Sequence, residues 1–273
     1  MSANEDFSKY VQNNITEMSK DRDFLGLSNV WIRECIRYNY AQNFSWLNRP
    51  IIQVPQDIYA LQEIIWQVKP DLIIETGIAH GGSLVMSASM LALLDYSKAA
   101  LQGKSIDPIK TKRRVLGIDI DIREHNRAGI EAHPMAHLIE MIQGSSIDSA
   151  VVDKVKATAQ DYNKILVCLD SNHTHDHVLA ELEAYAPLTS QESYCIVWDT
   201  GVEDLPKGFC KDRPWDKGNN PKTAVWEYLS RLDIDDKIAA DGKSLRFEID
   251  KVIENKLMIT AAPDGFLKRI PVD

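Results

Sequence analysis

The sequence predicts an α/β fold with a mostly parallel sheet that helices cover on both faces. First, strand-like apolar runs alternate with helix-like segments from residue 55 onward. Second, the runs that would form parallel strands end in acids or small residues, at the sheet edge where such folds bind ligands. Third, two strand-like segments follow each other near the C-terminus, which predicts an antiparallel edge.

The N-terminal segment, residues 5–46, has a mixed and largely helical pattern. It is rich in aromatic residues: Trp31, Tyr38, Tyr40, Phe44 and Trp46. Aromatic side chains in such number suit docking on a core or on a second subunit. We therefore expect a helical extension over residues 1–50, a main domain over residues 51–273, and a homo-oligomer formed through the extension.

The regular pattern begins with a helix over residues 55–70, because Pro55 suits a first turn and Pro70 suits an end. Five strands and five further helices follow in alternation. We expect strands at 71–75, 114–119, 137–144, 164–170 and 193–199, and helices at 82–95, 124–131, 146–159, 174–185 and 221–232. Segments 243–250 and 255–269 read as two neighbouring strands joined by a turn, which completes a seven-stranded sheet.

Composition and charge exclude several classes of protein. The chain has 273 residues, 44% of them hydrophobic, which allows a sizeable core, and its net charge of −9 predicts no general basic surface for nucleic acid. No apolar run approaches the ~20 residues of a membrane span, and the polar segment MSANEDFSKY lacks the apolar stretch of a signal peptide, so we expect neither. The four cysteines form no CxxC pair, so we expect a reduced, cytoplasmic protein.

Acids and small residues gather where the parallel strands end. Four of the five strands end in an acidic residue, and the need for turn-forming residues alone does not explain these acids. The residues concerned are Glu75, Thr76, Gly77, Gly81 and Ser83 after the first strand, Asp119 after the second, Gly144, Ser145 and Ser146 after the third, Asp170 after the fourth and Asp199 after the fifth. The sequence therefore predicts a binding cleft at this edge.

The first turn indicates which ligand the cleft takes. It reads ExGxxxG from Glu75 to Gly81, and it lacks the GxGxxG pattern of a dinucleotide site. A carboxylate here repels a pyrophosphate and attracts an ammonium group, while Asp119 is placed to accept hydrogen bonds from two ribose hydroxyls. A nucleoside with a positive amino-acid tail, S-adenosylmethionine (SAM), suits both, and a nicotinamide dehydrogenase is disfavoured.

Four motifs resemble one known family. "PDLIIETGIAHGGSL", "GIDIDIR", "LDSNHTHDHV" and "GNNPKTAVWEYL" together look like the cephalosporin hydroxylase family, over about residues 46–232. That family has the Rossmann-like fold of class I SAM-dependent methyltransferases and includes rhamnosyl O-methyltransferases. The chain also resembles, more remotely, metal-dependent macrolide-sugar and catechol O-methyltransferases.

The resemblance implies roles for individual residues. It gives Glu75 and Gly77 to the methionine end of SAM, Asp119 to the ribose and Ser145 to the adenine side. Thr76, Gly81, Ser83, Gly144, Ser146 and Asp170 complete the expected cofactor site. It implies that Asp170 and Asp199 bind Mg²⁺ or a similar divalent cation, and that His173 is a general base.

The chain departs from the sugar-modifying relatives at one position. Those relatives have Glu-Asp at the end of the fifth strand, whereas this chain has Trp198-Asp199. Thr200, Asn172, water or substrate hydroxyls could complete the site, or metal binding could be weakened or lost. A zinc site of His173, His175 and His177 is disfavoured, because His175 points away on a helix; His175 and His177 are read as surface or helix-start residues.

We expect a SAM-dependent, divalent-metal-assisted O-methyltransferase acting on a hydroxyl of a sugar, a glycan or a polyhydroxylated natural product. Two alternatives stay open: a hydroxylase or hydroxylase partner of the cephalosporin hydroxylase type, and a non-catalytic cofactor-binding relative. Residues 213–224 form a polar loop just past the fifth strand, which is either a lid over the acceptor site or a plain connection.

Overall fold

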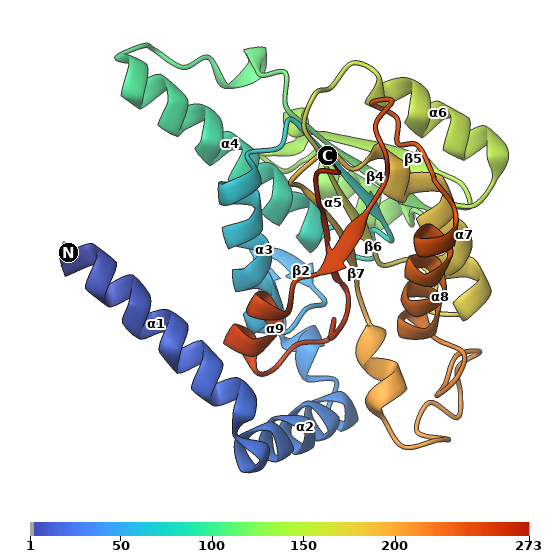
Figure 1. Cartoon of the computed structure of the whole chain (residues 1–273). Coiled ribbons are helices and arrows are strands. Elements are labelled where there is room, and N and C mark those ends of the chain that lie inside the picture. The colour runs from blue at the N-terminus through green and yellow to red at the C-terminus, as the bar shows by residue number, and fades with distance from the viewer. Residues whose placement is uncertain (1–2, 273) are drawn as a thin grey trace.

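A seven-stranded sheet forms the centre of the structure, a computed structural model that describes residues 3–272 (Figure 1). The strand order is β5-β4-β3-β6-β7-β9-β8. Strands β3 to β7 pair in parallel, and β9 lies antiparallel between β7 and β8. Their bounds are β3 Leu72–Thr76, β4 Arg114–Asp119, β5 Ile139–Gln143, β6 Ile165–Leu169, β7 Tyr194–Val197, β8 Phe247–Ile249 and β9 Phe266–Arg269. The predicted sheet with its antiparallel edge is confirmed.

Helices cover both faces of the sheet and build one apolar core on each. On one face α3 (Pro55–Val68), α4 (Gly82–Gln102) and α5 (Glu124–Glu131) pack on residues such as Ile73 and Val115. On the other face α6 (Ser149–Ala159), α7 (His175–Tyr185) and α8 (Pro221–Ile234) pack on residues such as Ile74 and Val167. The strands β3 and β6 are buried along their whole length, which explains their continuous apolar sequences.

The N-terminal extension consists of two long helices and a small hairpin. They are α1 (Ala3–Lys20), α2 (Arg22–Arg37), the 3₁₀ turn η1 (Tyr40–Asn43) and strands β1 (Phe44–Trp46) and β2 (Arg49–Ile51). The indole N–H of Trp46 donates to Ser89 Oγ at 3.0 Å, which anchors the hairpin on α4. Figure 1 shows α1 reaching away from the sheet. The division at residue 50 falls inside β2, and it stays a prediction.

One predicted element is wrong. Segment 255–269 was expected to be strand from its start, but Lys251–Leu257 form helix α9, and strand β9 begins at Phe266. The Asp250 side chain accepts the N–H groups of Val252 and Ile253 and so starts this helix. The apolar run that suggested a strand is the packed face of α9 and the loop behind it.

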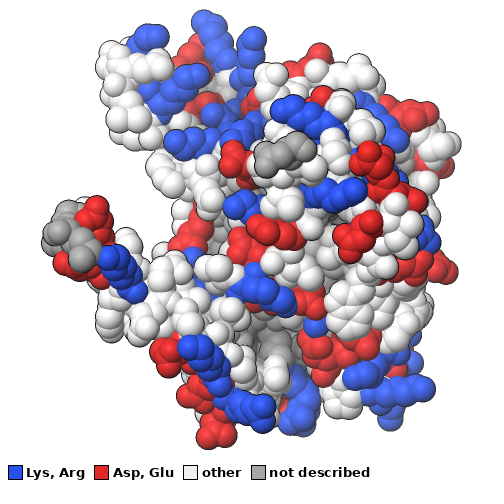
Figure 2. Space-filling model, viewed as in Figure 1, with Lys and Arg blue, Asp and Glu red and all other residues white. Residues whose placement is uncertain are grey.

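Helix α4 is longer than expected and continues to Gln102. Among residues 3–272 it is the one helix whose length and composition would allow a membrane crossing, yet half of that stretch is buried in the protein core. Its outer end leads into a basic segment that carries Lys98, Lys104, Lys110 and Lys112. Figure 2 shows basic side chains gathered at the upper left, where Figure 1 places the outer end of α4, while acids and bases are mixed elsewhere on that face.

Candidate active site

The turn after β3 is held against the end of β6. Gly77 and Gly81 have positive φ angles of 85° and 82°, a conformation that favours glycine. A Cβ on Gly77 would lie 2.1 Å from the carbonyl oxygen of Asp170, so no side chain fits there. The turn therefore needs glycine because it packs closely on the backbone at Asp170, whether or not a ligand also approaches it.

Asp119 fixes the same turn from the neighbouring strand. Its Oδ2 accepts the backbone N–H of Ile78 at 2.8 Å and that of Ala79 at 3.3 Å. Its Oδ1 accepts the N–H of Asp121 at 3.0 Å. Each carboxylate oxygen has further capacity to accept, so Asp119 can bind hydroxyl groups while it holds the loop.

A cavity of about 300 Å³ lies at the carboxyl ends of the strands. It brings together predicted site residues from four strand ends: Gly77, Ser83, Asp119, Asp170, His173 and Asp199. A pocket of about 130 Å³ adjoins it and shares Gly77, Asp119 and Ser171, and Ser145 and Ser146 line that pocket. Thr76, Gly81 and Gly144 line neither space; Thr76 is fully buried, and its Oγ1 accepts the Asp170 N–H at 3.3 Å.

Glu75 lies behind the main cavity. Its side chain is 3% exposed, and the hydroxyl of Ser83 donates to its Oε1. It lines a small adjacent space that Gln53, Ser83 and Asp170 also line. Burial raises the pKa of Glu75 to about 7, while the Ser83 hydrogen bond lowers it. Glu75 is thus a buried acid that a cation could convert to its charged form.

Asp170, His173 and Asp199 converge at the ends of β6 and β7. One ligand atom from each lies within 4.8 Å of the others. The Nε2 atom of His173 is 3.3 Å from Oδ2 of Asp199. Burial, and then the charges of Asp199 and Glu75, raise the pKa of Asp170 well above its usual value. A divalent cation would relieve this crowding of acids, so the oxygen-rich donor set fits a hard metal ion.

Trp198 contributes nothing to this cluster. It is buried and packs edge-on against Phe266, with ring centroids 5.9 Å apart. The backbone then turns at Asp199, whose φ of 54° is left-handed, and the 3₁₀ turn η5 (Thr200–Asp204) follows. Within residues 3–272, the potential metal ligands grouped at this place are two carboxylates and one imidazole.

The sequence profile of the rhamnosyl O-methyltransferase/CmcI family matches residues 38–270. The chain belongs to this family. Rhamnosyl O-methyltransferases of Mycobacterium tuberculosis and Mycobacterium bovis are 30% identical over 216 residues, which cover 78% of this chain and 73% of theirs. The Mycobacterium leprae rhamnosyl O-methyltransferase is 26% identical over 235 residues, covering 85% and 86%.

Solved structures agree on the fold. CmcI solved with Mg and SAM superposes with a TM-score of 0.52 and 16% identity, over 84% of this chain and 78% of CmcI. CmcI in its apo form gives a TM-score of 0.50 at the same identity, over 85% and 78%. These findings confirm the family resemblance, the class I methyltransferase fold and the enzyme class, a SAM-dependent O-methyltransferase.

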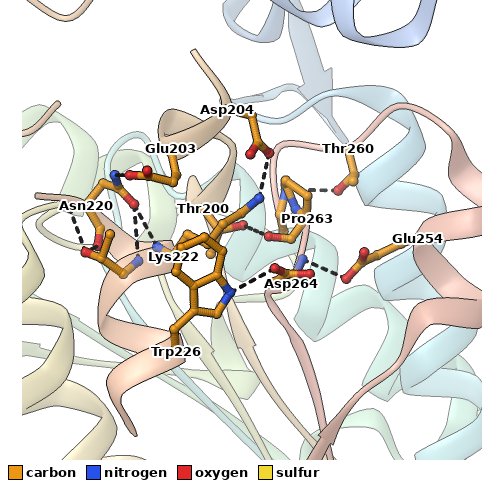
Figure 3. Close-up of polar contacts among 12 residues, drawn as sticks. Thr200, Glu203, Asp204, Asn220, Lys222, Trp226, Glu254, Thr260, Pro263 and Asp264 are labelled. Carbon is orange, nitrogen blue, oxygen red and sulfur yellow. Dashed lines mark hydrogen bonds and ion pairs between the residues drawn. The ribbon is translucent and has the colours of Figure 1, made fainter. Parts of the chain in front are cut away.

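In the present protein, a polar network fixes η5 beside Asp199 (Figure 3). Lys222 Nζ donates to Asp204 at 2.6 Å, and Asn220 Nδ2 donates to Glu203 at 2.6 Å. The hydroxyl of Thr200 donates to the carbonyl of Pro263 at 2.6 Å. Helix α8 and the segment before β9 therefore hold the wall of the cleft in place.

The loop of residues 213–224, which the sequence left open as a lid or a plain connection, contacts the candidate site. The ring of Trp215 lies edge-on to His173, with centroids 4.6 Å apart, and the guanidinium of Arg213 lies over the Trp215 ring, 5.4 Å from its centroid. Asp216 and Asn219 pair their backbones and close the loop. The loop therefore contacts His173 through the ring of Trp215.

His175 and His177 lie in the first turn of α7, which agrees with one of the two readings of the sequence, and both rings have side-chain partners. The imidazole of His175 contacts Thr223 Oγ1 at 2.8 Å and Glu227 at 3.0 Å, which ties α7 to α8. His177 Nε2 lies 3.0 Å from Ser146 Oγ and 3.1 Å from Ser171 Oγ, beneath the pocket that Ser145 lines. Ser146 follows β5, another strand end, so the local sequence carries no signal for that contact, whereas Ser171 precedes His177 in the same connection between β6 and α7.

Proposed function

We propose that this methyltransferase transfers the methyl group of SAM to a hydroxyl of a rhamnosyl or similar sugar, with a divalent metal held by Asp170 and Asp199. Names of the relatives support the sugar acceptor, since three mycobacterial proteins that match this chain are rhamnosyl O-methyltransferases. The structures of CmcI with Mg and SAM support the pair of cofactors.

A single observation carries the proposal. Asp170, His173 and Asp199 converge within 4.8 Å on the wall of a cavity whose other walls hold Asp119 and Ser83. A carboxylate pair, a proton acceptor and a nucleoside site thus share one space. That combination suits transfer of a group from SAM to a hydroxyl that must first lose a proton.

The cofactor would span the two adjoining pockets. Ser145 and Ser146 would flank the adenine, and Asp119 would accept hydrogen bonds from the ribose hydroxyls. The ammonium group would lie near Ser83, where the buried carboxylate of Glu75 contributes negative charge. Gly77 keeps the loop close to the strand ends.

The chain's own residues would prepare the acceptor. A divalent cation supplies positive charge that lowers the pKa of an acceptor hydroxyl. Asp170 and Asp199 would hold that charge at the cleft wall, and His173 Nε2 would accept the hydroxyl proton. Trp215 packs edge-on against the imidazole and would hold its orientation. Such positioning of the base beside the acceptor hydroxyl would account for much of the rate.

The donor set favours methyl transfer over oxygenase chemistry. An oxygenase iron site uses two histidines and a carboxylate on one face. Among the residues that the structure describes, His173 is the one histidine grouped with Asp170 and Asp199. His175 and His177 are engaged with other partners.

Mass spectrometry tests the proposal directly. The enzyme is incubated with isotope-labelled SAM, Mg²⁺ and a panel of glycosides that includes methyl α-rhamnoside, methyl glucoside and a catechol. Label should appear on a sugar and foremost on the rhamnoside. Label on the catechol alone would contradict the sugar acceptor.

A further inference from the structure

The outer end of α4 projects beyond the body of the protein. The last buried residue of this helix is Leu94, and the helix continues to Gln102, which adds about 12 Å of helix past the core. All of residues 101–110 are exposed. The chain then returns to the start of β4, and Figure 1 shows this excursion standing clear of the sheet. Residues 98–112 are called the basic projection below.

Hydrogen bonds hold the basic projection in one shape. The Asp95 carboxylate accepts the Nε–H of Arg113 at 2.9 Å and also the hydroxyl of Thr111, which ties the returning segment to α4. The side chain of Asp107 caps the 3₁₀ turn η2 (Pro108–Lys110) at its start. The projection is therefore a built part of the fold.

Positive charge gathers on the projection. A hollow of about 530 Å³ lies between the end of α4 and the returning segment. Four lysines line it: Lys98, Lys104, Lys110 and Lys112. Among residues 3–272, a carboxylate lies within ion-pair distance of only one of these four, since Lys110 is 3.2 Å from Asp107. The other three ammonium groups are free to bind an anionic partner.

The remaining acids of the hollow are already engaged. Asp71 accepts the backbone N–H groups of Asn163 and Lys164 at 3.2 Å and 2.7 Å, and Asp95 is paired with Arg113. The chain as a whole has a net charge of −9, so this basic area departs from the rest of the protein. Charges more than about 8 Å apart are largely screened at physiological ionic strength, so the distant acids act only weakly on whatever the projection touches.

Aliphatic side chains stand on the same projection as the lysines. Leu101 is 87% exposed, Ile109 is 75% exposed and Ile106 is 43% exposed. Covering such side chains is favourable in proportion to their apolar area. A partner that suits the whole projection must therefore offer both negative charge and an apolar environment.

An anionic lipid bilayer offers both. Anionic headgroups attract lysine side chains, and the boundary between headgroups and acyl chains accepts aliphatic ones. Nucleic acid would bind the lysines through its phosphates and leave the aliphatic side chains in water. A symmetric contact with a second copy of the chain would place the same lysines against each other.

We propose that the basic projection docks the protein on the surface of an anionic lipid bilayer. Headgroup phosphates lie against Lys98, Lys104 and Lys112, and Leu101 and Ile109 enter the headgroup layer. The contact is peripheral, because the first part of α4 is packed in the protein core. The projection leads into the amino end of β4, whereas the candidate active site lies at the carboxyl ends of the strands. The inference therefore does not depend on the identity of the acceptor.

Co-sedimentation with vesicles tests the docking and needs no catalytic turnover. The full-length protein is mixed, at physiological ionic strength, with vesicles of phosphatidylcholine alone or with vesicles in which phosphatidylglycerol replaces a third of it. Affinity for the anionic vesicles should be higher by about 100-fold, since each of three lysines contributes about 5-fold near an anionic surface. Equal affinity for both vesicles, or no binding to the anionic ones, would overturn the inference.

A double substitution, Lys104→Gln with Lys112→Gln, locates the contact. It should weaken binding to the anionic vesicles by about 25-fold. The matched control is Lys154→Gln with Lys156→Gln, which removes the same charge from exposed positions on α6. The control should bind as the wild type does. An equal loss in both double variants would show that only net charge matters and would refute a local site.

Leu101→Ser with Ile109→Ser tests the apolar part of the contact. Affinity for the anionic vesicles should fall by about 10-fold, because the aliphatic side chains no longer gain from burial. Ile234→Ser is the control, since Ile234 is 82% exposed at the end of α8. Unchanged affinity in the Leu101 and Ile109 variant, or equally tight binding of the wild type to a duplex DNA oligonucleotide, would indicate a general polyanion site and overturn membrane docking.

Discussion

The Nε2 atom of His173 lies 3.3 Å from Oδ2 of Asp199, although the two residues follow different strands of the sheet. The parallel neighbours β6 and β7 bring them together, since both strands end at the same edge. Asp170 completes the group within 4.8 Å. This juxtaposition supports the proposed roles of one base and two metal ligands.

Replacing His173 by Gln should slow methyl transfer by about 10²–10⁴-fold, because a positioned base contributes that much. Affinity for SAM should stay close to that of the wild type. Single-turnover transfer to the identified acceptor, measured across the pH range, gives the rate. His175→Gln is the control, since its ring is bonded to Thr223 and Glu227 away from the cavity. A wild-type rate in His173→Gln would mean that the proton leaves by another route.

Asp170→Asn and Asp199→Asn should each weaken Mg²⁺ binding by about 10-fold or more, since loss of even an outer partner of a metal site costs that much. Titration calorimetry with Mg²⁺ measures the affinity. Asp148→Asn serves as the control, because that carboxylate caps α6. Equal Mg²⁺ affinity in all four proteins would place the metal elsewhere or remove it from the mechanism.

Asp119→Ala should weaken SAM binding by about 1–3 kcal/mol, the cost of losing a buried hydrogen-bonding partner. The substitution also frees the N–H groups of Ile78 and Ala79, which loosens the cofactor loop. Calorimetry with SAM gives the value, and Asp121→Ala, whose side chain is 70% exposed, is the control. Unchanged affinity after Asp119→Ala would contradict the cofactor assignment.

SAM binding should release a proton from Glu75. Burial raises the pKa of this carboxyl to about 7, so it is largely protonated in the free enzyme below that pH. An ammonium group nearby favours the carboxylate and lowers the pKa, so affinity should rise between about pH 5.5 and 7, below the range where the amine of SAM itself titrates.

The measurement is SAM calorimetry in two buffers with different ionisation enthalpies. The wild type should show a buffer-dependent enthalpy at about pH 6.5, and Glu75→Gln should not. An enthalpy that is independent of buffer in the wild type would show that the ammonium group does not interact with Glu75.

The homo-oligomer stays a prediction, and α1 offers the test. Phe7 and Tyr10 stack with ring centroids 6.3 Å apart and are 65% and 62% exposed, as expected for an uncovered contact surface. Tyr10→Glu should lower the mass found by light scattering, whereas Tyr96→Glu, equally exposed on α4, should not. A monomeric wild type would refute the oligomer.

The sequence alone was sufficient to predict the sheet and the edge of the sheet where the candidate site lies, and the reason is physical. Buried parallel strands such as β3 and β6 must be apolar throughout, and their carboxyl ends must meet at one edge. Glu75, Asp119 and Asp170 could therefore be grouped before any contact was known. Helix α9 was missed because its apolar face resembles a strand, although the capping residue Asp250 was a usable signal.

Contacts between residues far apart in the chain could not be predicted from the sequence. Trp215 contacts His173 from a separate loop, and His177 contacts Ser146, which follows another strand. A further cavity, between α2 and η5, depends on how the N-terminal extension packs, which no local pattern encodes. The sequence shows Trp198 where the resemblance implies a carboxylate, and its packing on Phe266 follows from the pairing of β7 with β9.

The most direct test of the whole account is methyl transfer from labelled SAM to methyl α-rhamnoside, with Mg²⁺ and after exhaustive chelation. NMR spectroscopy of the product locates the label. The account predicts a methyl ether on a sugar hydroxyl with Mg²⁺, loss of turnover after chelation and its return when Mg²⁺ is restored, with SAM still bound throughout. Transfer that continues at the same rate in the chelated enzyme, or label on no sugar oxygen, would contradict it.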